Sequence, residues 1–344
     1  MAQTALVTGG SGYFGSLLVR RLRERGDDVR VLDLNDADDR PAEVDFVRGD
    51  ICDANAVEHA CEDVDVVYHN VAQVPLARDA GLFESVNVGG TETLLRGCAD
   101  AGVRKVVYTS SSAVFGVPQE NPVFPDTQPR PAEEYGRAKH AGELLCRAAV
   151  SRGLDVSIVR PRTILGHGRL GIFGILFDWI ADGADVFVFG SGDNVYQFVH
   201  ANDLAEACAL AGKRAGPATY NIGAREFGTM RAALENLCAH AGTGSKVRSL
   251  PVGPAALGMR ASAKLGLTPF GPYHWIMYSK SLWFDTSAAE RDLGWRAEYS
   301  TDAMFADSYD WFLANRGALA GAGASHHRSP AKQGALTLLK KIMR

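Results

Sequence analysis

Two side chains near the middle of the sequence have types and a spacing that suit proton transfer. Tyr135 and Lys139 open a stretch of helical periodicity that continues to about Arg152, and residues four apart lie on one face of a helix. A tyrosine hydroxyl ordinarily titrates at about pH 10, and a neighbouring ammonium group favours its ionised form. Tyr135 could therefore accept a proton from an alcohol or donate one to a ketone.

A glycine-rich turn near the N-terminus has the pattern of a phosphate-binding site. It follows the apolar segment 4–8 and precedes a helix predicted at about 14–25. Glycines allow a sharp turn, a close approach of the backbone to a pyrophosphate, and tight packing of the helix on the strand. Free N–H groups at the helix N-terminus attract the phosphates. The dinucleotide contacts predicted here are Gly9, Gly12, Tyr13, Phe14 and Gly15.

A carboxylate at the end of the next predicted strand indicates which dinucleotide binds. Asp33 follows Gly15 by 18 residues, near the spacing of an acid that binds the hydroxyls of the adenine ribose. The same acid repels a 2′-phosphate, and the residues after it, Leu34-Asn35-Asp36, include no arginine. The sequence therefore predicts NAD as the cofactor in preference to NADP.

The remaining predicted cofactor contacts each follow a predicted strand. An acid after the strand at 44–47 is expected near the adenine, and capping of the next helix is its alternative or additional role. Small residues after the buried strand 64–69 would let the backbone pass close to the cofactor. These further contacts are Asp50, Ile51, Val71, Ala72 and Pro161.

The alternation of strands and helices up to about residue 161 predicts an α/β fold, a doubly wound parallel sheet with helices on both faces. Ligands of such sheets bind at the carboxyl ends of the strands, where the glycine turn, Asp33, Ser111 and Pro161 all fall. We expect an NAD-binding domain over 1–165, to which parts of 190–225 return. A smaller mixed α/β substrate domain is expected mainly over 166–315.

The C-terminal residues 316–344 are predicted to form a flexible linker and a basic tail. Residues 317–325 are rich in glycine and alanine, and residues 325–344 hold five lysines and arginines but no acid. Leucines and basic residues recur at roughly helical spacing over 335–344. This pattern predicts peripheral contact with an anionic membrane surface, and a frayed terminus is the alternative.

Composition narrows the class of protein. A net charge of −4 gives no general reason to expect binding to nucleic acid. The six cysteines show no metal-binding spacing, so we expect reduced core thiols and no metal site. Because the chain opens directly into a strand and has no apolar run of about 18 residues, we expect neither a signal peptide nor a membrane span. The expected location is the cytoplasm, with peripheral contact at the inner membrane face as a further hypothesis.

These motifs together resemble those of extended short-chain dehydrogenase/reductases of the NAD-dependent epimerase/dehydratase superfamily, which use a Rossmann fold. The resemblance covers about residues 1–315 and rests on Gly9-x-x-Gly12-x-x-Gly15, Asp33, Ser110-Ser111-Ser112 and Tyr135-x-x-x-Lys139. It implies a hydride transfer in which Tyr135 is the acid/base and Lys139 supports it and binds the nicotinamide ribose. Ser111, three residues before Val114 as in the family pattern, would hold the substrate oxygen, with Ser112 as the alternative.

Absent residues separate the branches of this superfamily. Sugar-nucleotide dehydratases carry Thr-Asp-Glu where this chain has Ser111-Ser112-Ala113, and decarboxylases of that group place Glu at Ala113, so both readings fail. Nucleotide-sugar epimerases usually hold the diphosphate with an arginine where this chain has Tyr196, and with a second one near Lys280. Arg225 or Arg231 could replace that clamp, so an epimerase remains the alternative.

The favoured branch resembles 3β-hydroxysteroid dehydrogenases, whose substrate regions are apolar. Three apolar stretches, 170–180, 272–278 and 282–284, favour a lipophilic 3-hydroxy or 3-keto substrate, although each alone could be ordinary core. A non-catalytic, NAD-binding homologue is a third reading; such proteins typically lose the tyrosine or the lysine, and this chain keeps both. The resemblance also implies a homodimer through the helices predicted at 82–102 and 132–152.

Overall fold

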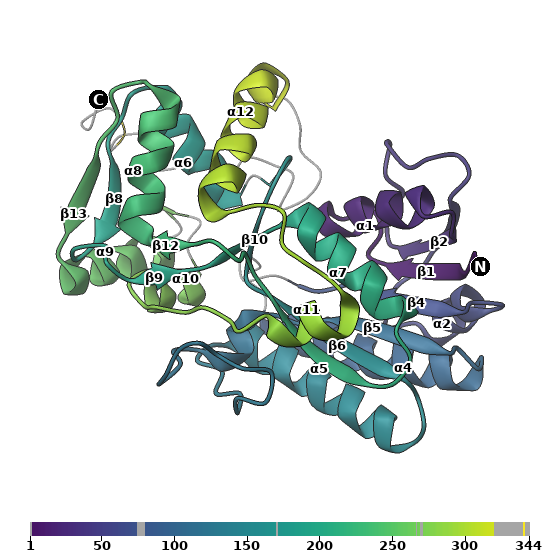
Figure 1. The fold of residues 1–344 in the computed structure, drawn as a ribbon. Coiled ribbons are helices and arrows are strands. Elements are labelled where there is room, and N and C mark those ends of the chain that lie inside the picture. Colours follow the sequence, from purple (N-terminus) through teal and green to yellow (C-terminus); the bar gives the residue numbers. More distant parts are fainter. Residues whose placement is uncertain are drawn as a thin grey trace.

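The computed structural model describes residues 2–73, 80–169, 171–265, 267–268, 271–319 and Lys340. Its centre is a seven-stranded parallel sheet with the strand order β11-β6-β5-β4-β1-β2-β3 (Figure 1). These strands are β1 (Thr4–Thr8), β2 (Asp28–Asp33), β3 (Asp45–Arg48), β4 (Val66–His69), β5 (Lys105–Thr109), β6 (Val156–Pro161) and β11 (Ala218–Ile222). The order runs outward in both directions from β1 and β4, so the predicted doubly wound sheet is confirmed.

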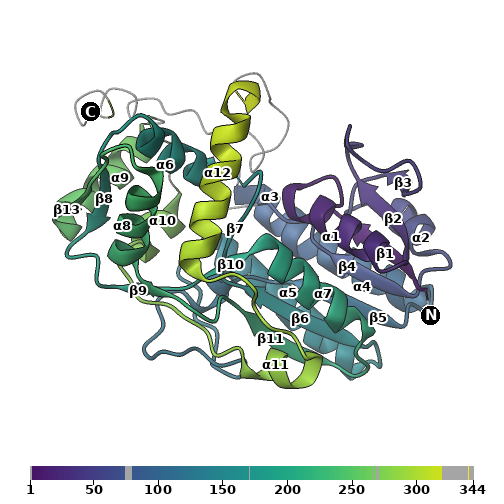
Figure 2. The same cartoon turned by 45° about the horizontal axis from the view of Figure 1, so that its top comes forward.

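Helices cover both faces of this sheet (Figure 2). Successive residues of β1 point to opposite faces: Val7 packs with α1, α7 and α11, whereas Leu6 packs with α2 and α4. Every residue of β4, β5 and β6 is buried, as expected for central strands of a parallel sheet that is covered on both faces. The helices are α1 (Tyr13–Glu24), α2 (Ala54–Cys61), α4 (Thr91–Asp100), α5 (Glu134–Ser151), α7 (Ala201–Lys213) and α11 (Ser287–Leu293).

The helix predicted at 82–102 is present without a gap over 80–100, but it is not α-helical throughout. The chain forms α3 (Ala80–Glu84), a π-helix at Ser85–Gly90 and then α4. Asn87, within the π-helix, accepts a hydrogen bond from the Gln73 backbone N–H at 2.7 Å and donates one to the Gln73 carbonyl at 3.1 Å. The wider turn lets this amide hold the loop after β4, and a search for a 3.6-residue period cannot detect it.

A second group of elements packs against the carboxyl end of the sheet. Its core is aromatic and includes Phe173, Phe177, Phe198, Phe305 and Tyr309. The helices are α6 (Gly171–Ala181), α8 (Met230–Ala241), α9 (Val252–Lys264), α10 (Pro272–Met277) and α12 (Thr301–Leu319), and the strands are β8 (Val186–Phe189) and β13 (Val247–Leu250). The domain boundaries at 165 and 315 remain predictions.

Short strand pairs join the two groups. β7 (Thr163–Leu165) pairs with β10 (Phe198–His200), and β9 (Val195–Tyr196) pairs with β12 (Gly228–Thr229). A short 3₁₀ helix, η2 (Ser112–Phe115), follows β5. Because β7 comes directly after β6, residues 161–165 lead from the large sheet into the second group.

The C-terminal prediction is partly outside the described residues. Residues 316–319, at the start of the predicted linker and tail, belong to the last turn of α12, so this part of the predicted linker is helical. Of the predicted basic tail only Lys340 is described. Its ammonium group lies 2.7 Å from Asp182 and also pairs with Asp178, both on or next to α6.

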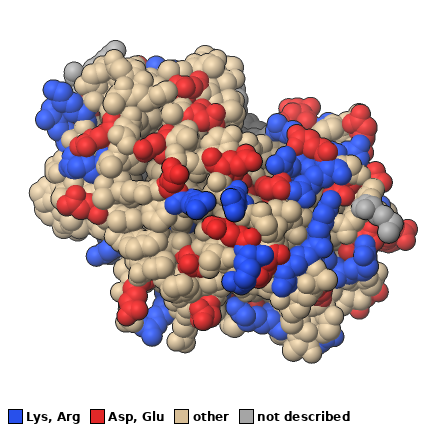
Figure 3. Space-filling view, viewed as in Figure 1, with Lys and Arg blue, Asp and Glu red and all other residues tan. Residues whose placement is uncertain are grey.

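Several features of the described residues bear on the compositional expectations. No helix in these ranges combines the length and apolar character needed to cross a membrane. The six cysteines are free thiols, of which only Cys52 is exposed. Figure 3 shows acidic and basic side chains intermixed on the viewed face.

Candidate active site

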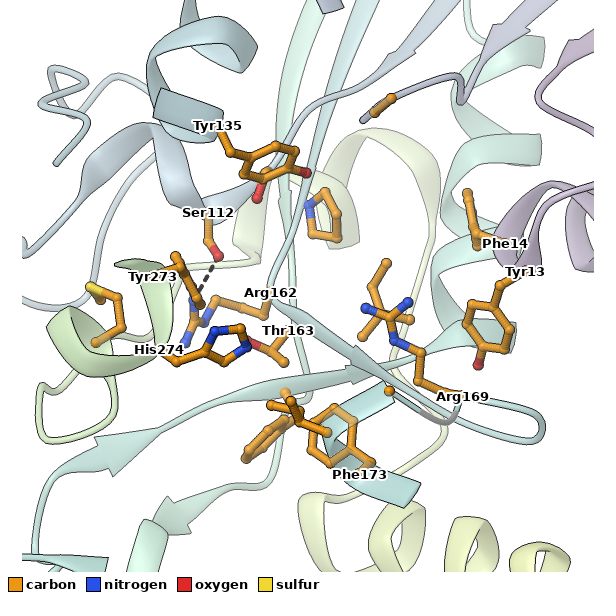
Figure 4. Close-up of a pocket in the computed structure, with 18 of the residues that line it drawn as sticks. Tyr13, Phe14, Ser112, Tyr135, Arg162, Thr163, Arg169, Phe173, Tyr273 and His274 are labelled. Atoms are coloured by element: carbon orange, nitrogen blue, oxygen red, sulfur yellow. Dashed lines mark hydrogen bonds between the residues drawn. The ribbon is translucent and has the colours of Figure 1, made fainter. Parts of the chain in front are cut away.

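A single cavity of about 1020 Å³ joins the predicted cofactor contacts to the second group of elements. It begins at the glycine turn, passes Ser111 and Tyr135, and continues between α6, α8 and α9. Figure 4 shows Tyr135, Ser112 and Arg162 on one side of the pocket and Tyr13, Phe14 and Arg169 on the other. Its lining includes every sequence-predicted site residue: Gly9, Gly12, Tyr13, Phe14, Gly15, Asp33, Asp50, Ile51, Val71, Ala72, Ser111, Ser112, Tyr135, Lys139 and Pro161.

The glycine turn is required by the local geometry. Gly9 has a φ of +72°, and a Cβ there would lie 3.1 Å from the backbone nitrogen of Val71. A Cβ on Gly15 would lie only 2.0 Å from the carbonyl oxygen of Gly9, so α1 can pack on β1 only without a side chain. α1 has no side-chain cap and no acid in its first turn, which leaves its N-terminal N–H groups available to an anion.

Asp33 ends β2 and faces the same cavity. Its carboxylate accepts a hydrogen bond from the Ser11 backbone N–H at 3.1 Å, which ties the acid to the glycine turn. Burial raises the pKa of Asp33, and the backbone hydrogen bonds oppose this shift. The features of this cavity fit NAD. The helix N-terminus and the close-packed glycines suit the pyrophosphate, and the nearby acid suits the adenine ribose.

Tyr135 is positioned by the start of α5. Glu133 caps this helix: its carboxylate accepts hydrogen bonds from the backbone N–H groups of Tyr135 at 2.8 Å and Gly136 at 2.7 Å. Burial raises the pKa of Tyr135 to about 12, while a side-chain hydrogen bond with Ser111 and the charge of Arg169 lower it. Ser111 itself caps η2, with its hydroxyl accepting from the Ala113 N–H at 3.1 Å.

Lys139 lies one helical turn after Tyr135, as the spacing predicts, and is buried. Its ammonium group donates to the Thr109 carbonyl at 2.9 Å and lies 5.0 Å from the centroid of the Tyr108 ring. Burial lowers the pKa of Lys139 to about 8. The buried lysine therefore titrates near neutral pH and is held by the strand end that precedes the serines.

The structure separates the two candidate serines. Ser111 lowers the pKa of Tyr135 and so interacts with its phenol. The buried Ser112 hydroxyl instead accepts from the Nη1 of Arg162 at 2.8 Å (Figure 4). The third serine, Ser110, donates to Glu143 at 2.6 Å and is part of the core. The three adjacent hydroxyls thus have three different partners.

Sequence reasoning missed two charged side chains of the cavity, Arg162 and Arg169. Tyr273 and His274, from the stretch 272–278 predicted for the substrate region, and Tyr196 also line it. The basic residues considered from the sequence as diphosphate clamps, Arg225, Arg231 and Lys280, are not among its described lining residues. The usable signal for Arg162 was its place directly after Pro161, at the end of a predicted strand, where ligands of such sheets bind.

Residues 5–223 match the model of the NAD dependent epimerase/dehydratase family. The chain belongs to this family. Its central parallel sheet and flanking helices are the Rossmann-like fold of such enzymes, and NAD is their cofactor. A solved structure, dTDP-glucose 4,6-dehydratase DesIV of Streptomyces venezuelae with NAD and TYD bound, superposes with a TM-score of 0.72 at 29% identity, covering 91% of this chain and 98% of that one.

Relatives in the family differ in their named activities. Uncharacterized protein y4nG of Sinorhizobium fredii is 52% identical over 100% of this chain and 87% of its own length. UDP-glucose 4-epimerase of Mycolicibacterium smegmatis is 34% identical over 63% of this chain and 76% of its own. Mouse sterol-4-alpha-carboxylate 3-dehydrogenase, decarboxylating, is 31% identical over 61% of this chain and 59% of its own. Both of the weighed branches therefore have members similar to this chain.

Proposed function

We propose that this family member is an NAD-dependent oxidoreductase that moves a hydride to or from a secondary alcohol or ketone of a lipophilic, steroid-like substrate. The observation that carries the proposal is the apolar part of the cavity beyond Tyr135. Its described lining includes Phe173, Leu176, Phe187, Leu234, Leu250 and Met259. A cavity of this lining suits a fused-ring or long-chain lipid.

In the proposed reaction, NAD held at the glycine turn and Asp33 would supply the acceptor for the hydride of the carbinol carbon. Ser111 donates a hydrogen bond to the substrate oxygen, and Tyr135 takes the hydroxyl proton as the carbonyl forms. Burial disfavours the phenolate, so Tyr135 needs the positive charges around it. Arg169 supplies one. Lys139 would supply a second and would also bind the nicotinamide ribose. In the reverse direction Tyr135 returns the proton.

A nucleotide-sugar 4-epimerase is the second candidate, favoured by the similarity to UDP-glucose 4-epimerase. Such an enzyme would use the same tyrosine, serine and lysine. Against it, Tyr196 occupies the place of the expected diphosphate arginine, and neither Arg231 nor Lys280 lines the cavity. Arg231 instead pairs with Glu235 at 3.0 Å on the surface of α8.

Two assays separate these candidates. Purified protein is incubated with NAD and 3-hydroxysteroids, or with NADH and 3-ketosteroids, and nicotinamide absorbance is followed; UDP- and dTDP-sugars are run in parallel with chromatography of the products. Net change of the nicotinamide with the steroid panel supports the proposal. Sugar interconversion without net cofactor change would replace it with the epimerase, and no turnover of either panel would favour the non-catalytic homologue.

Location and assembly are also proposals. Dimerisation through the helices at 82–102 and 132–152 is supported by Leu144, which is 54% exposed on α5. Contact of 335–344 with a membrane is tested by flotation with anionic vesicles. Lys340 is engaged by two acids of the α6 region, so its own contribution to such contact is expected to be small.

A further inference from the structure

Two arginines that lie two residues apart are buried in contrasting ways. Arg160 and Arg162 are 0% and 1% exposed. Arg160 donates from Nε to Glu143 at 2.8 Å and from Nη2 to the same carboxylate at 2.6 Å, and from Nη1 to the Pro125 carbonyl at 2.8 Å. Its charge and all three of its donor nitrogens are satisfied within the fold.

Arg162 lacks this arrangement. Only Nη1 has a partner, the Ser112 hydroxyl at 2.8 Å, and no described carboxylate forms an ion pair with the guanidinium. Nε and Nη2 are buried with no hydrogen-bond partner among the described residues. These two nitrogens form the edge that, in Arg160, binds Glu143 as a fork. A buried cation with an open fork is costly unless an anion completes it.

The surroundings of Arg162 hold the guanidinium in place. Its Cζ lies 4.7 Å from the centroid of the Tyr196 ring and 5.6 Å from that of Phe284, so the charge is placed against two aromatic rings. The Tyr196 hydroxyl bonds with that of Thr163 at 2.9 Å and is 3.4 Å from that of Tyr273. Thr163, Tyr196, Tyr273 and Arg162 are all among the residues that line the cavity.

The site adjoins the reacting atoms. Ser112, the partner of Arg162, is adjacent in sequence to Ser111, and both serines line the same cavity as Tyr135 and Arg162. In Figure 4 Ser112 lies between Tyr135 and Arg162. A group bound to Arg162 would therefore be close to the carbon whose oxygen is held by Ser111 and Tyr135.

We propose that Arg162 is a specificity residue that binds a carboxylate of the substrate, carried on a carbon next to or near the reacting carbinol. The inference rests on the proposed oxidoreductase function and adds an anionic group to the substrate. A carboxylate has two oxygens at the spacing of the Nε–Nη2 fork. A phosphate offers the same chemistry, but the cavity beyond this point is apolar, which suits one charged group on a lipid and not a nucleotide diphosphate.

The test compares a charged substrate with its neutral form. Wild type and R162Q are assayed with NAD and a 3-hydroxysteroid-4-carboxylic acid or its methyl ester; R296Q, at an exposed arginine, is the matched control. We expect R162Q to lose about 100-fold or more of kcat/KM for the acid, as two charge-assisted hydrogen bonds are lost. The ester should lose at least about 10-fold less than the acid, so R162Q should lower the ratio of the two kcat/KM values, and R162K should lie between because it keeps the charge without the fork.

Other outcomes overturn the proposal. If R162Q loses kcat/KM equally for the acid and the ester, Arg162 has a structural role. If the wild type does not prefer the acid, the substrate carries no carboxylate that Arg162 recognises. If R162Q fails to fold, the preference of the wild type for the acid over the ester decides whether the substrate carries a carboxylate. If the wild type shows no preference for the acid but binds UDP, and R162Q binds UDP more weakly, Arg162 binds a diphosphate instead.

A binding readout keeps the two proposals distinguishable. If the wild type oxidises no steroid, the proposed function fails, and thermal stabilisation by the acid is measured in the presence of NAD. Stabilisation of the wild type but not of R162Q would retain the carboxylate site. Absence of stabilisation by the acid in both proteins would reject it.

Discussion

The buried ion pair between Glu143 and Arg160 offers a stability test whose size follows from its geometry. Both side chains are 0% exposed, and the Glu143 carboxylate also accepts the Ser110 hydroxyl at 2.6 Å. The pair thereby joins α5, β6 and the strand end that carries the serines. In E143Q the Arg160 charge stays buried without its anion, and an amide N–H₂ faces the guanidinium. Removing one partner of a buried pair costs about 3–5 kcal/mol, a large part of the stability of a typical domain.

Equilibrium unfolding in urea, followed by far-UV circular dichroism, measures this cost. R296Q, at an exposed position, should stay within about 0.5 kcal/mol of the wild type. R162Q should cost about 1 kcal/mol or less, because it removes a buried cation that has no described carboxylate partner. A loss below about 1 kcal/mol in E143Q would refute the reasoning on the buried pair. A loss in R162Q as large as in E143Q would show that Arg162 is held as a structural residue.

Two further predictions concern the cofactor and the lysine. Asp33→Ser removes the acid that we propose binds the adenine ribose, so the ratio of the NADP to the NAD dissociation constant should fall about 10-fold or more in fluorescence titrations. An unchanged ratio would show that Asp33 does not contact the ribose. Lys139 has a pKa of about 8 when folded, against 10.5 for the unfolded side chain, so between these values the unfolded chain binds more protons and stability rises with pH. Between pH 8 and pH 10.5, the free energy of unfolding of the wild type should therefore rise by up to about 3 kcal/mol relative to that of K139M, measured in urea without NAD. If the difference between the two proteins does not change with pH, the burial of a charged lysine is contradicted.

Much of the fold was predictable because its signals are local. The glycine turn, Asp33 and the Tyr135/Lys139 spacing each depend on a few neighbouring residues, and parallel topology then brings them to one edge of the sheet. The π-helix at 85–90 was not predictable, since its inserted turn is fixed by the Asn87 contact with Gln73, a partner 14 residues away.

The polar chemistry of the substrate pocket also escaped prediction. Arg160 and Arg162 read alike in the sequence, and what distinguishes them is the carboxylate of α5 that reaches one and not the other. The rings that face Arg162 come from residues 196 and 284, far along the chain. Tertiary packing alone determines which of the two buried arginines has a carboxylate partner.

The central claim is that Tyr135 transfers the proton while a hydride moves between NAD and a lipophilic alcohol. The most direct measurement compares wild type and Y135F for NADH formation with a 3-hydroxysteroid, with NAD affinity measured in the same preparations. The account predicts net NADH from the wild type, a loss of about 10³-fold in kcat in Y135F, and NAD affinity within about 3-fold. Full turnover by Y135F, or sugar-nucleotide interconversion with no net NADH, would contradict it.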